Sequence, residues 1–345
     1  MLKELLQKRN LPPLKSKEEM LDILLKEEYG YLPPKPDKVT WVETDNYINC
    51  FCAGKATIKK VDITSYIGDK TFTFPVYASI PVGKEKYPFF VAINFRDSVP
   101  DRFMPTEEII DNGFAVLSFS YQDITSDDND FTTGLAGILF ENGKRSDTDA
   151  AKLSLWAWAA HRVMDYAQTL DSLDINRSIV SGHSRLGKTA LLTAATDCRF
   201  AGVFSSGAGC GGASLTREKL GENVRDICQH FPQWFCENYK KYKDKEYEMP
   251  FDQHYLLASI APRPICVSTA SGEHDPLSEM LSCLAASPAY ERYGKRGFVS
   301  ENRPPVVGDQ FHKGNIALQM RDGIHYMSRE DWNGAFKFFR KHFNL

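Results

Sequence analysis

The sequence lacks the features that mark membrane and nucleic-acid-binding proteins. No apolar run is long enough to span a bilayer, and the N-terminal segment Met-Leu-Lys-Glu-Leu-Leu-Gln-Lys has no secretory apolar core. The 345 residues carry a net charge of only −3, with both signs interspersed, so no charge pattern predicts nucleic acid or an anionic lipid surface as a partner. We therefore expect a cytoplasmic protein without a nucleic-acid or membrane partner.

Cysteine is also sparse. Eight cysteines are too few for a disulfide scaffold in a chain of this length, and none has the C-x-x-C spacing of a common zinc site. The segment Cys50-Phe51-Cys52 is more simply an alternating strand than a metal site. We expect neither a metal nor a cofactor.

The apolar pattern predicts a doubly wound α/β protein. Residues 56–64 and 71–80 alternate, as antiparallel strands at one edge of a sheet do. Near-continuous apolar runs at 89–93 and 114–119 are typical of parallel strands buried on both faces. Further strands are expected at 177–181, 200–206 and 264–269, between helical patterns that include 147–168 and 329–342.

The organisation predicts a single domain over residues 1–345. A capping box at Ser16-Lys17-Glu18-Glu19 begins a helix that ends near Gly30, and an extended linker follows to about residue 35. An insertion at about 211–254 is rich in Trp, Tyr, Lys and Glu. The chain has no internal repeat and no low-complexity tract that would mark a boundary.

Residues 182–189, Gly-His-Ser-Arg-Leu-Gly-Lys-Thr, satisfy two catalytic motifs at once. As G-x-x-x-x-G-K-T they form a phosphate-binding P-loop, and as Gly-His-Ser-Arg between a strand and a helix they form a serine nucleophile elbow. A P-loop NTPase usually has a further strand that ends in Asp or Glu to help hold magnesium, but strand 200–206 ends without a carboxylate. The P-loop match is therefore interpreted as coincidental.

The elbow requires an acid and then a histidine downstream, and the chain has both. Strand 264–269 leads into Ala-Ser-Gly-Glu-His-Asp-Pro, which contains Glu273 and Asp275, and His325 lies in a polar loop before the last helix. We expect Ser184 to be the nucleophile and His325 the base. The Gly-x-x-Asp-Pro turn favours Asp275 as the acid, with Glu273 as the alternative. The other histidines near these motifs, His183, His254 and His274, are expected to be structural or to lie at a rim.

The elbow departs from the general Gly-x-Ser-x-Gly, because Leu186 and Gly187 hold its fifth and sixth positions. It resembles the Gly-Cys-Ser-Arg-x-Gly-Lys-Gly elbow of the glucuronoyl esterases, carbohydrate esterase family 15. Other segments from about residue 20 to the end resemble bacterial members of that family: 209–213, 231–236, 250–254, 260–264 and 321–325, the last followed by Asp331-Trp332.

The resemblance implies a three-layer α/β/α hydrolase sandwich with a mostly parallel sheet. It implies a carbohydrate ester as substrate, namely an ester of glucuronate such as those that link glucuronoxylan to lignin alcohols. It also implies that Arg185 acts near the oxyanion, that Lys188 contacts the sugar hydroxyls, and that Gln233 and Trp234 form part of the cleft. The oxyanion is expected to meet the backbone N–H of Arg185 and an N–H near Phe95 and Arg96.

Two departures from the family pattern bear on these expectations. Gly207 stands where fungal members have the triad glutamate, so the acid is expected from the 273–275 loop, as in some bacterial members. That loop lacks the tryptophan that usually covers the sugar. Acetyl xylan esterase is the alternative activity. A non-catalytic binding protein on a hydrolase fold is a further alternative, disfavoured because Ser, acid and His all stand in the required order.

Overall fold

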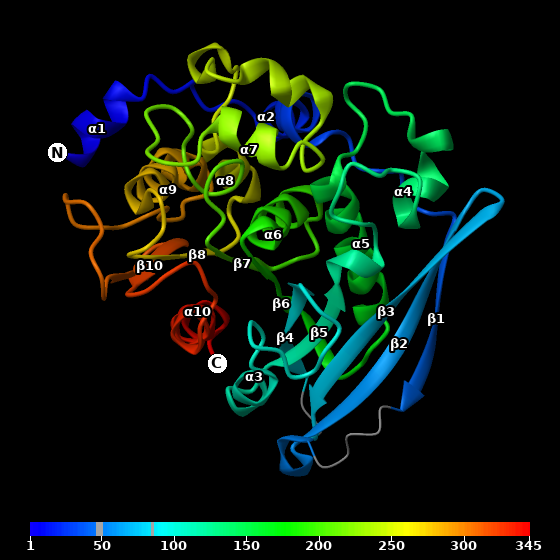
Figure 1. Ribbon diagram of the computed structural model, residues 1–345. Helices are drawn as coiled ribbons and strands as arrows, with labels where there is room; N and C mark the ends of the chain where they lie inside the picture. Colours follow the sequence, from blue (N-terminus) through cyan, green and yellow to red (C-terminus); the bar gives the residue numbers. More distant parts are fainter. Residues whose placement is uncertain (46–50, 84–85) are drawn as a thin grey trace.

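The computed structural model describes residues 1–45, 51–83 and 86–345. Within this part of the chain the strands form a ten-stranded sheet in the order β1-β2-β3-β5-β4-β6-β7-β8-β10-β9 (Figure 1). The strands are β1 (Lys38–Asp45), β2 (Ala56–Ile67), β3 (Lys70–Pro81), β4 (Tyr87–Asn94), β5 (Ala115–Ser120), β6 (Leu173–His183), β7 (Gly202–Ser206), β8 (Ile265–Ala270), β9 (Gln310–Phe311) and β10 (Ile316–Arg321).

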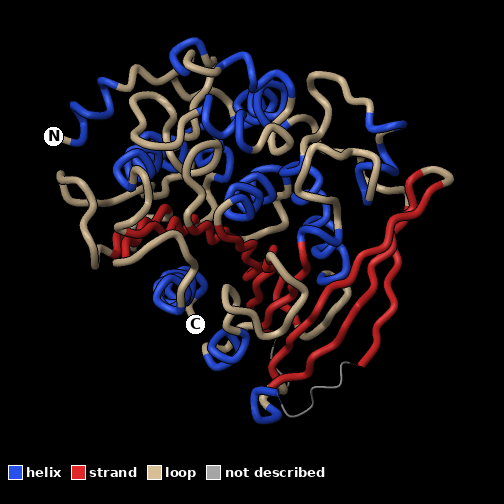
Figure 2. The backbone as a smooth tube through the Cα atoms, viewed as in Figure 1, coloured by secondary structure: helices blue, strands red, loops and turns tan. Residues whose placement is uncertain are grey.

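The sheet is parallel from β5 to β10 and antiparallel at both edges. At one edge, β1 pairs antiparallel with β2, β2 with β3, and β3 with β5. At the other edge, β9 pairs antiparallel with β10. The long edge strands project as a twisted ribbon from the body of the sheet (Figure 2). The expected α/β fold with an antiparallel edge is confirmed.

Helices cover both faces of the sheet (Figure 1). They are α1 (Leu2–Lys8), α2 (Lys17–Leu24), α3 (Thr106–Asp111), α4 (Gly134–Leu139), α5 (Lys152–Ala167), α6 (Arg185–Thr196), α7 (Val224–His230), α8 (His254–Ile260), α9 (Pro276–Glu291) and α10 (Arg329–Phe343). One apolar core joins α5, α6, α8 and α9 to the sheet, and a second joins α3 and α10 to its other face. The sheet with helices packed on both of its faces gives the three layers of an α/β/α sandwich.

The capping box at Ser16 begins α2 as expected, and a π-helical turn, Leu25–Tyr29, continues that helix up to Gly30. The strand interpretation at Cys50-Phe51-Cys52 is wrong for the described residues, because Phe51–Gly54 forms a short 3₁₀ segment with positive φ at Cys52. Cys50 itself lies outside the described residues. No helix in the described part of the chain is both long and apolar enough to cross a bilayer.

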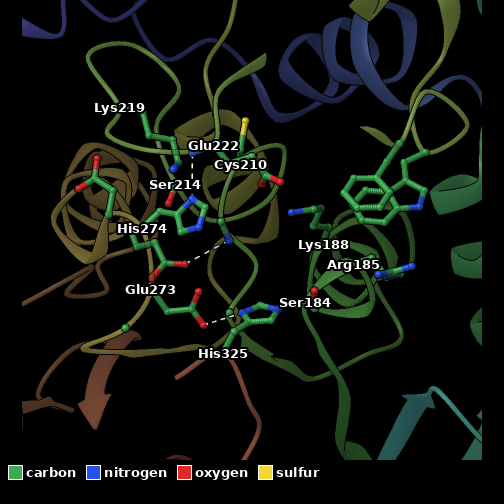
Figure 3. Close-up of a pocket in the computed structure, with 17 residues that line it drawn as sticks. Ser184, Arg185, Lys188, Cys210, Ser214, Lys219, Glu222, Glu273, His274 and His325 are labelled. Carbon is green, nitrogen blue, oxygen red and sulfur yellow. Dashed lines mark hydrogen bonds and ion pairs between the residues drawn. The ribbon is translucent and has the colours of Figure 1, made fainter. Parts of the chain in front are cut away.

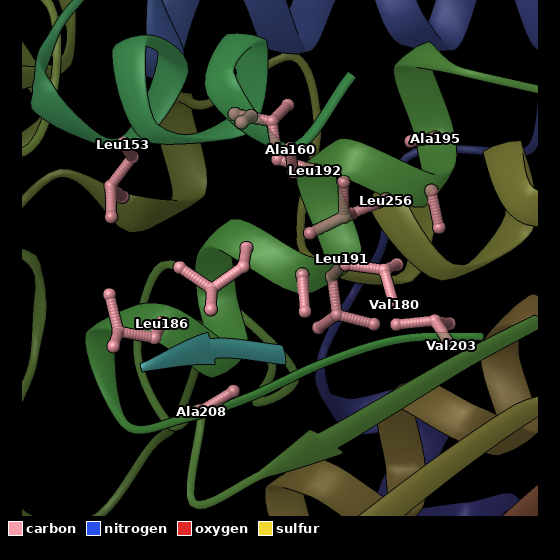
Figure 4. Close-up of a cluster of buried hydrophobic side chains, with 14 of the residues drawn as sticks. Leu153, Ala160, Val180, Leu186, Leu191, Leu192, Ala195, Val203, Ala208 and Leu256 are labelled. Atoms are coloured by element: carbon pink, nitrogen blue, oxygen red, sulfur yellow. The ribbon is translucent and has the colours of Figure 1, made fainter. Parts of the chain in front are cut away.

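Helix α6 fixes the position of the nucleophile motif by burying one side against the sheet (Figure 4). Leu186, Leu191 and Leu192 are fully buried, and Leu191 lies near Val180 of β6 and Val203 of β7. Each such leucine contributes roughly 1.5–3 kcal/mol relative to an exposed position. The first turn of α6 therefore cannot shift without opening this core.

Candidate active site

Ser184 occupies the single-residue turn between β6 and α6. Its backbone has φ 60° and ψ −127°, a conformation that costs a non-glycine residue about 1–3 kcal/mol. The turn is so tight that a side chain at Gly182 would begin 2.2 Å from the carbonyl oxygen of Leu186, too close for any residue but glycine. The Ser184 N–H donates to the carbonyl of Ser206, 2.8 Å away, which ties the turn to β7. This is the strained geometry of a nucleophile elbow.

The same geometry argues against the P-loop. In a P-loop the residues between the two glycines wrap around a phosphate, whereas here Arg185 to Lys188 are already helical. Lys188 is 4% exposed, and its ammonium donates to the carbonyl oxygen of Ala208. Burial also lowers the pKa of this ammonium. The P-loop match is therefore coincidental, as expected.

Ser184 lies in a cavity of about 350 Å³ at the carboxyl ends of the parallel strands (Figure 3). The wall also includes residues from α6, the segment after β7, the loop after β8 and the loop after β10. The lining residues are Ser184, Arg185, Lys188, Gly207, Gly209, Cys210, Ser214, Lys219, Glu222, Phe231, Trp234, Gly272, Glu273, His274, Asp275, Glu279 and His325.

His325 forms a pair with Glu273 in this cavity. The Nδ1 atom of His325 lies 2.8 Å from Oε1 of Glu273. A carboxylate at this position accepts the Nδ1 proton of a neutral imidazole, so Nε2 is left as the acceptor. Figure 3 shows the other ring nitrogen of His325 pointing away from Glu273, toward the side of the cavity on which Ser184 lies. Ser184 and the His325–Glu273 pair therefore line the same cavity.

The structure corrects the expectation that Asp275 contacts His325. The Asp275 carboxylate instead caps α9: it accepts from the N–H of Ser278 at 3.0 Å and from the Ser278 hydroxyl at 2.5 Å. Its Oδ2 also accepts from the N–H of Leu220 at 3.0 Å. The Asp-Pro pair is a helix-start signal, since Pro276 takes the first helical position and Asp275 the N-cap. The alternative, Glu273, is the residue on the imidazole.

Gly207 leaves room for the Glu273 carboxylate beside His325. Its φ is +56°, and a side chain there would begin 3.0 Å from Oε1 of Glu273 and 3.1 Å from Cε1 of His325. The Glu273 carboxylate therefore lies where a side chain at position 207 would point. The prediction that the acid comes from the 273–275 loop agrees with this geometry.

Arg185 is paired with Asp127, a residue that the sequence analysis did not identify. The guanidinium forms an ion pair with Oδ2 of Asp127. Oδ1 of the same carboxylate accepts from Nε1 of Trp234 at 2.7 Å and from Nε2 of Gln233 at 3.0 Å. Its Oδ2 also accepts from the hydroxyl of Tyr121 at 3.2 Å. Asp127 thus connects three of the predicted site residues, and Arg185 does not present an unpaired positive charge.

The predicted cleft residues fall into two groups, those that line the cavity and one that lies outside its lining. Trp234 lines the cavity, stacks on Phe231 with centroids 3.9 Å apart, and lies 4.6 Å from the Arg185 guanidinium carbon. Gln233 is buried and does not line the cavity; its side-chain amide N–H donates to Asp127. The Lys188 ammonium is 5.8 Å from the Trp234 ring. Arg185, Lys188 and Trp234 are brought together at the cavity, and Gln233 supports them.

The two expected oxyanion donors differ in placement. The N–H of Arg185 belongs to the first turn of α6, where helical N–H groups have no intrahelical acceptor, and Arg185 lines the cavity. The N–H of Phe95 already donates to Oδ1 of Asn94 at 2.9 Å. The side chain of Arg96 pairs with Asp101, and neither Phe95 nor Arg96 lines the cavity. This geometry therefore does not support the N–H of Phe95 as an oxyanion donor.

The other histidines near the motifs occupy the supporting positions expected of them. His183 is 3% exposed and lies behind His325, with ring centroids 4.5 Å apart. Burial, together with the neighbouring His325, lowers the pKa of His183 to about 3, so its imidazole stays neutral. His254 is buried and contacts the carbonyl of Pro12, whereas His274 lies at the cavity rim.

No group of three or more His, Cys, Asp or Glu side chains in the described ranges is placed to hold a metal ion. The cavity does contain a buried carboxyl that the sequence analysis did not identify, Glu279 of α9. Burial, reinforced by the charge of nearby Glu273, raises its pKa to about 7. Oε1 of Glu279 accepts from the N–H of Gly209 at 3.3 Å. Glu279 therefore supports the segment whose Ala208 carbonyl holds Lys188.

Comparison with known proteins agrees with this geometry. A family model described as "Glucuronyl esterase, fungi" matches residues 63–294, more than half of the chain. Carbohydrate esterase MZ0003, from an unknown prokaryotic organism, is 35% identical over 243 residues, which are 68% of this chain and 55% of that protein. A 4-O-methyl-glucuronoyl methylesterase 1 from Wolfiporia cocos is 27% identical over 297 residues, 83% of this chain and 68% of that protein.

Solved structures are similar along nearly the whole chain. A glucuronoyl esterase from Solibacter usitatus superposes with a TM-score of 0.86 at 30% identity, covering 94% of this chain and 91% of that one. The chain spans little more than half the length of carbohydrate esterase MZ0003.

Proposed function

The chain belongs to the glucuronoyl esterases of carbohydrate esterase family 15, and on that premise we propose that it is a serine esterase that hydrolyses glucuronate esters. The observation that carries the proposal is the strained Ser184 turn in one cavity with the His325–Glu273 pair. Residues 1–345 act as one catalytic domain, and the insertion at about 211–254 contributes Trp234 to the cleft.

The proposed chemistry is a two-step acyl transfer. Nε2 of His325 takes the hydroxyl proton of Ser184 as the oxygen attacks the ester carbonyl, because an unassisted hydroxyl is a weak nucleophile. Glu273 holds the imidazole tautomer and stabilises the imidazolium that forms. The imidazolium then protonates the leaving alcohol, and an acyl-serine remains. Water, activated by the same imidazole, releases the acid and restores Ser184.

The oxyanion is stabilised at the start of α6. The Arg185 N–H lies at the positive end of the helix dipole, and such a donor typically contributes about 3 kcal/mol to transition-state stabilisation. The guanidinium, although paired with Asp127, adds to the positive potential there. Removing Asp127 would change both the charge and the orientation of this arginine.

The substrate is proposed to be a uronate ester because of where the binding groups lie. Arg185, Lys188 and Trp234 line the cavity beside the nucleophile. In a uronate ester the reacting carbonyl is part of the sugar, so contacts to the sugar orient the electrophile itself. In an acetylated sugar the same contacts would hold only the leaving group. The names of the similar proteins, glucuronoyl esterases and methylesterases, support this class of substrate.

A comparison of three esters tests the proposal. We expect kcat/KM for benzyl or methyl glucuronate to exceed that for acetylated xylose and for an aryl acetate, measured at the same pH and temperature. The loop 273–275 has no tryptophan to cover the sugar, so we expect a weak KM for small glucuronate esters. A preference for acetylated xylose of about tenfold or more, or 1.4 kcal/mol, would replace this proposal with the acetyl esterase alternative.

A further inference from the structure

A short segment after β7 forms one wall of the active-site cavity and is held there by the loop that carries the acid. The segment, residues 219–222, is here called the strap, and residues 272–275 are called the acid loop. The N–H of Glu222 donates to Nδ1 of His274 at 2.9 Å. The N–H of Leu220 donates to Oδ2 of Asp275 at 3.0 Å. Two adjacent side chains of the acid loop therefore bind two alternate N–H groups of the strap.

Gly221 lies between these two hydrogen bonds and fits the same contact. Its φ is +69°, and a side chain at this position would begin 2.6 Å from both Cβ and Nδ1 of His274. Only a glycine lets the strap backbone lie directly against the imidazole, because any Cβ would collide with it. The steric fit and the hydrogen bonds are independent observations, and both concern His274.

The strap has few other supports. Before it, the N–H of Arg217 donates to Asp252 at 3.3 Å, and after it, Asn223 caps α7. Between these anchors, the hydrogen bonds found among the described residues are one from the Tyr247 hydroxyl to Oε1 of Glu218, just before the strap, those to His274 and Asp275, and one within the strap, from the Lys219 ammonium to the Leu220 carbonyl. The position of the strap therefore depends on the acid loop.

The strap brings two charged side chains to the cavity. Lys219 and Glu222 both line it, and Lys219 and His274 lie across the cavity from Arg185 and Lys188 (Figure 3). A ligand bound against Ser184 would therefore have the strap as one wall, and any displacement of the strap would widen the cavity. None of the strap's hydrogen bonds involves Ser184, His325 or Glu273.

We propose that His274 and Asp275 are positioning residues that fix the strap as the substrate-binding wall, so that His274 sets the affinity for the ester without taking part in its cleavage. The inference rests on the proposed function in that the ester binds in this cavity. In this proposal Asp275 has two roles: it caps α9, and it accepts a hydrogen bond from the N–H of Leu220.

Two substitutions of His274 test the role of its acceptor atom. Because Nδ1 accepts from Glu222, the neutral ring carries its proton on Nε2. His274→Ala removes the acceptor, whereas His274→Asn places an amide oxygen at nearly the position of Nδ1. Loss of one such hydrogen bond is worth about 1 kcal/mol, so we expect KM for benzyl glucuronate to rise about five- to tenfold in His274→Ala. We expect kcat to change less than about twofold, and His274→Asn to restore KM.

Two further variants make the test specific. His230→Ala is the matched control, because His230 is exposed at the end of α7 and does not line the cavity. Gly221→Ala leaves His274 intact but separates the strap from it, so its KM should also rise with little change in kcat. An unchanged KM in both His274→Ala and Gly221→Ala would overturn the proposal, as would an equal loss in kcat.

Hydrogen–deuterium exchange separates this inference from the proposed function. The Leu220 and Glu222 amides should exchange faster in His274→Ala than in the wild type, and His274→Asn should resemble the wild type. Equal exchange in all three proteins would overturn the inference whatever the enzyme cleaves. If the two amides exchange faster in His274→Ala and the wild type cleaves no glucuronate ester, the strap contact is supported and only the proposed function is contradicted.

Discussion

Oε1 of Glu273 lies 2.8 Å from Nδ1 of His325. The Glu273 side chain is 16% exposed, while that of His325 is 47% exposed, so the carboxylate is shielded from water and the imidazole remains open to the cavity. A carboxylate in this position can orient the ring and stabilise its charged form during proton transfer. The contact also explains the glycine at 207, whose missing side chain leaves room for the carboxylate.

Substitution of the two carboxylates in the acid loop should separate catalysis from stability. We expect Glu273→Ala to lower kcat by about 10³–10⁴-fold on any ester that the protein cleaves, because the imidazole loses its orienting partner. Asp275→Ala should leave kcat nearly unchanged but lower the free energy of unfolding by about 1 kcal/mol, since it removes the N-cap of α9. Steady-state kinetics and urea unfolding of both variants measure this. A larger loss of kcat in Asp275→Ala than in Glu273→Ala would contradict the assignment.

Asp127 should affect both binding and the chemical step. It pairs with Arg185 beside the nucleophile and holds the indole of Trp234. We expect Asp127→Ala to raise KM and lower kcat, with a combined loss of about 10–100-fold in kcat/KM, because loss of a buried charge partner costs more than loss of a neutral hydrogen bond. Asp128→Ala is the control, since Asp128 is exposed and, among the described residues, its side-chain hydrogen bonds stay within its own loop. Equal effects of the two substitutions would show that Asp127 acts only through the loop.

The buried carboxyl of Glu279 should make stability depend on pH. Burial raises its pKa from the usual 4.5 to about 7, so the folded protein binds this proton more tightly than the unfolded chain does. The protonated carboxyl therefore favours the fold below pH 4.5, and this contribution is lost as pH rises to about 7. The loss is at most about 3 kcal/mol.

Glu279→Gln removes this titration. We expect its thermal midpoint to change less between pH 4.5 and 7.5 than that of the wild type, and the variant to gain relative stability at the higher pH. Melting curves at a series of pH values check this expectation. Identical pH profiles for the two proteins would show that Glu279 titrates in the same way in the folded and unfolded states.

Much of the fold could be predicted because its main signals are local. The buried strands around residues 89–93 and 114–119 and the closing helix are visible as apolar runs and as helical periodicity. Helix α9 was not predicted, because most of its surface is buried, its apolar residues do not mark one face, and Pro288 lies inside it. Strand β10 was also missed. Its burial follows from its place beside β8, which no local pattern shows.

The site shows the same division. The proposed roles of Ser184 and His325 could be inferred from the sequence, because the strand-turn-helix motif and the chain order point to them. The choice between Glu273 and Asp275 depended on the start of α9, where the Asp-Pro pair serves as a cap. The contacts of Asp127 and Glu279 depend on loops that meet only in the folded chain. No spacing in the sequence relates those residues to the nucleophile.

The most direct test of the account is the kcat/KM of Ser184→Ala on benzyl glucuronate beside that of the wild type. We predict measurable hydrolysis by the wild type and a loss of at least about 10⁴-fold in the variant, because the attacking hydroxyl is gone. The thermal midpoint should not fall, since the substitution removes no side-chain hydrogen bond found among the described residues. Retention of more than about a tenth of the wild-type value would contradict the assignment of Ser184 as the nucleophile.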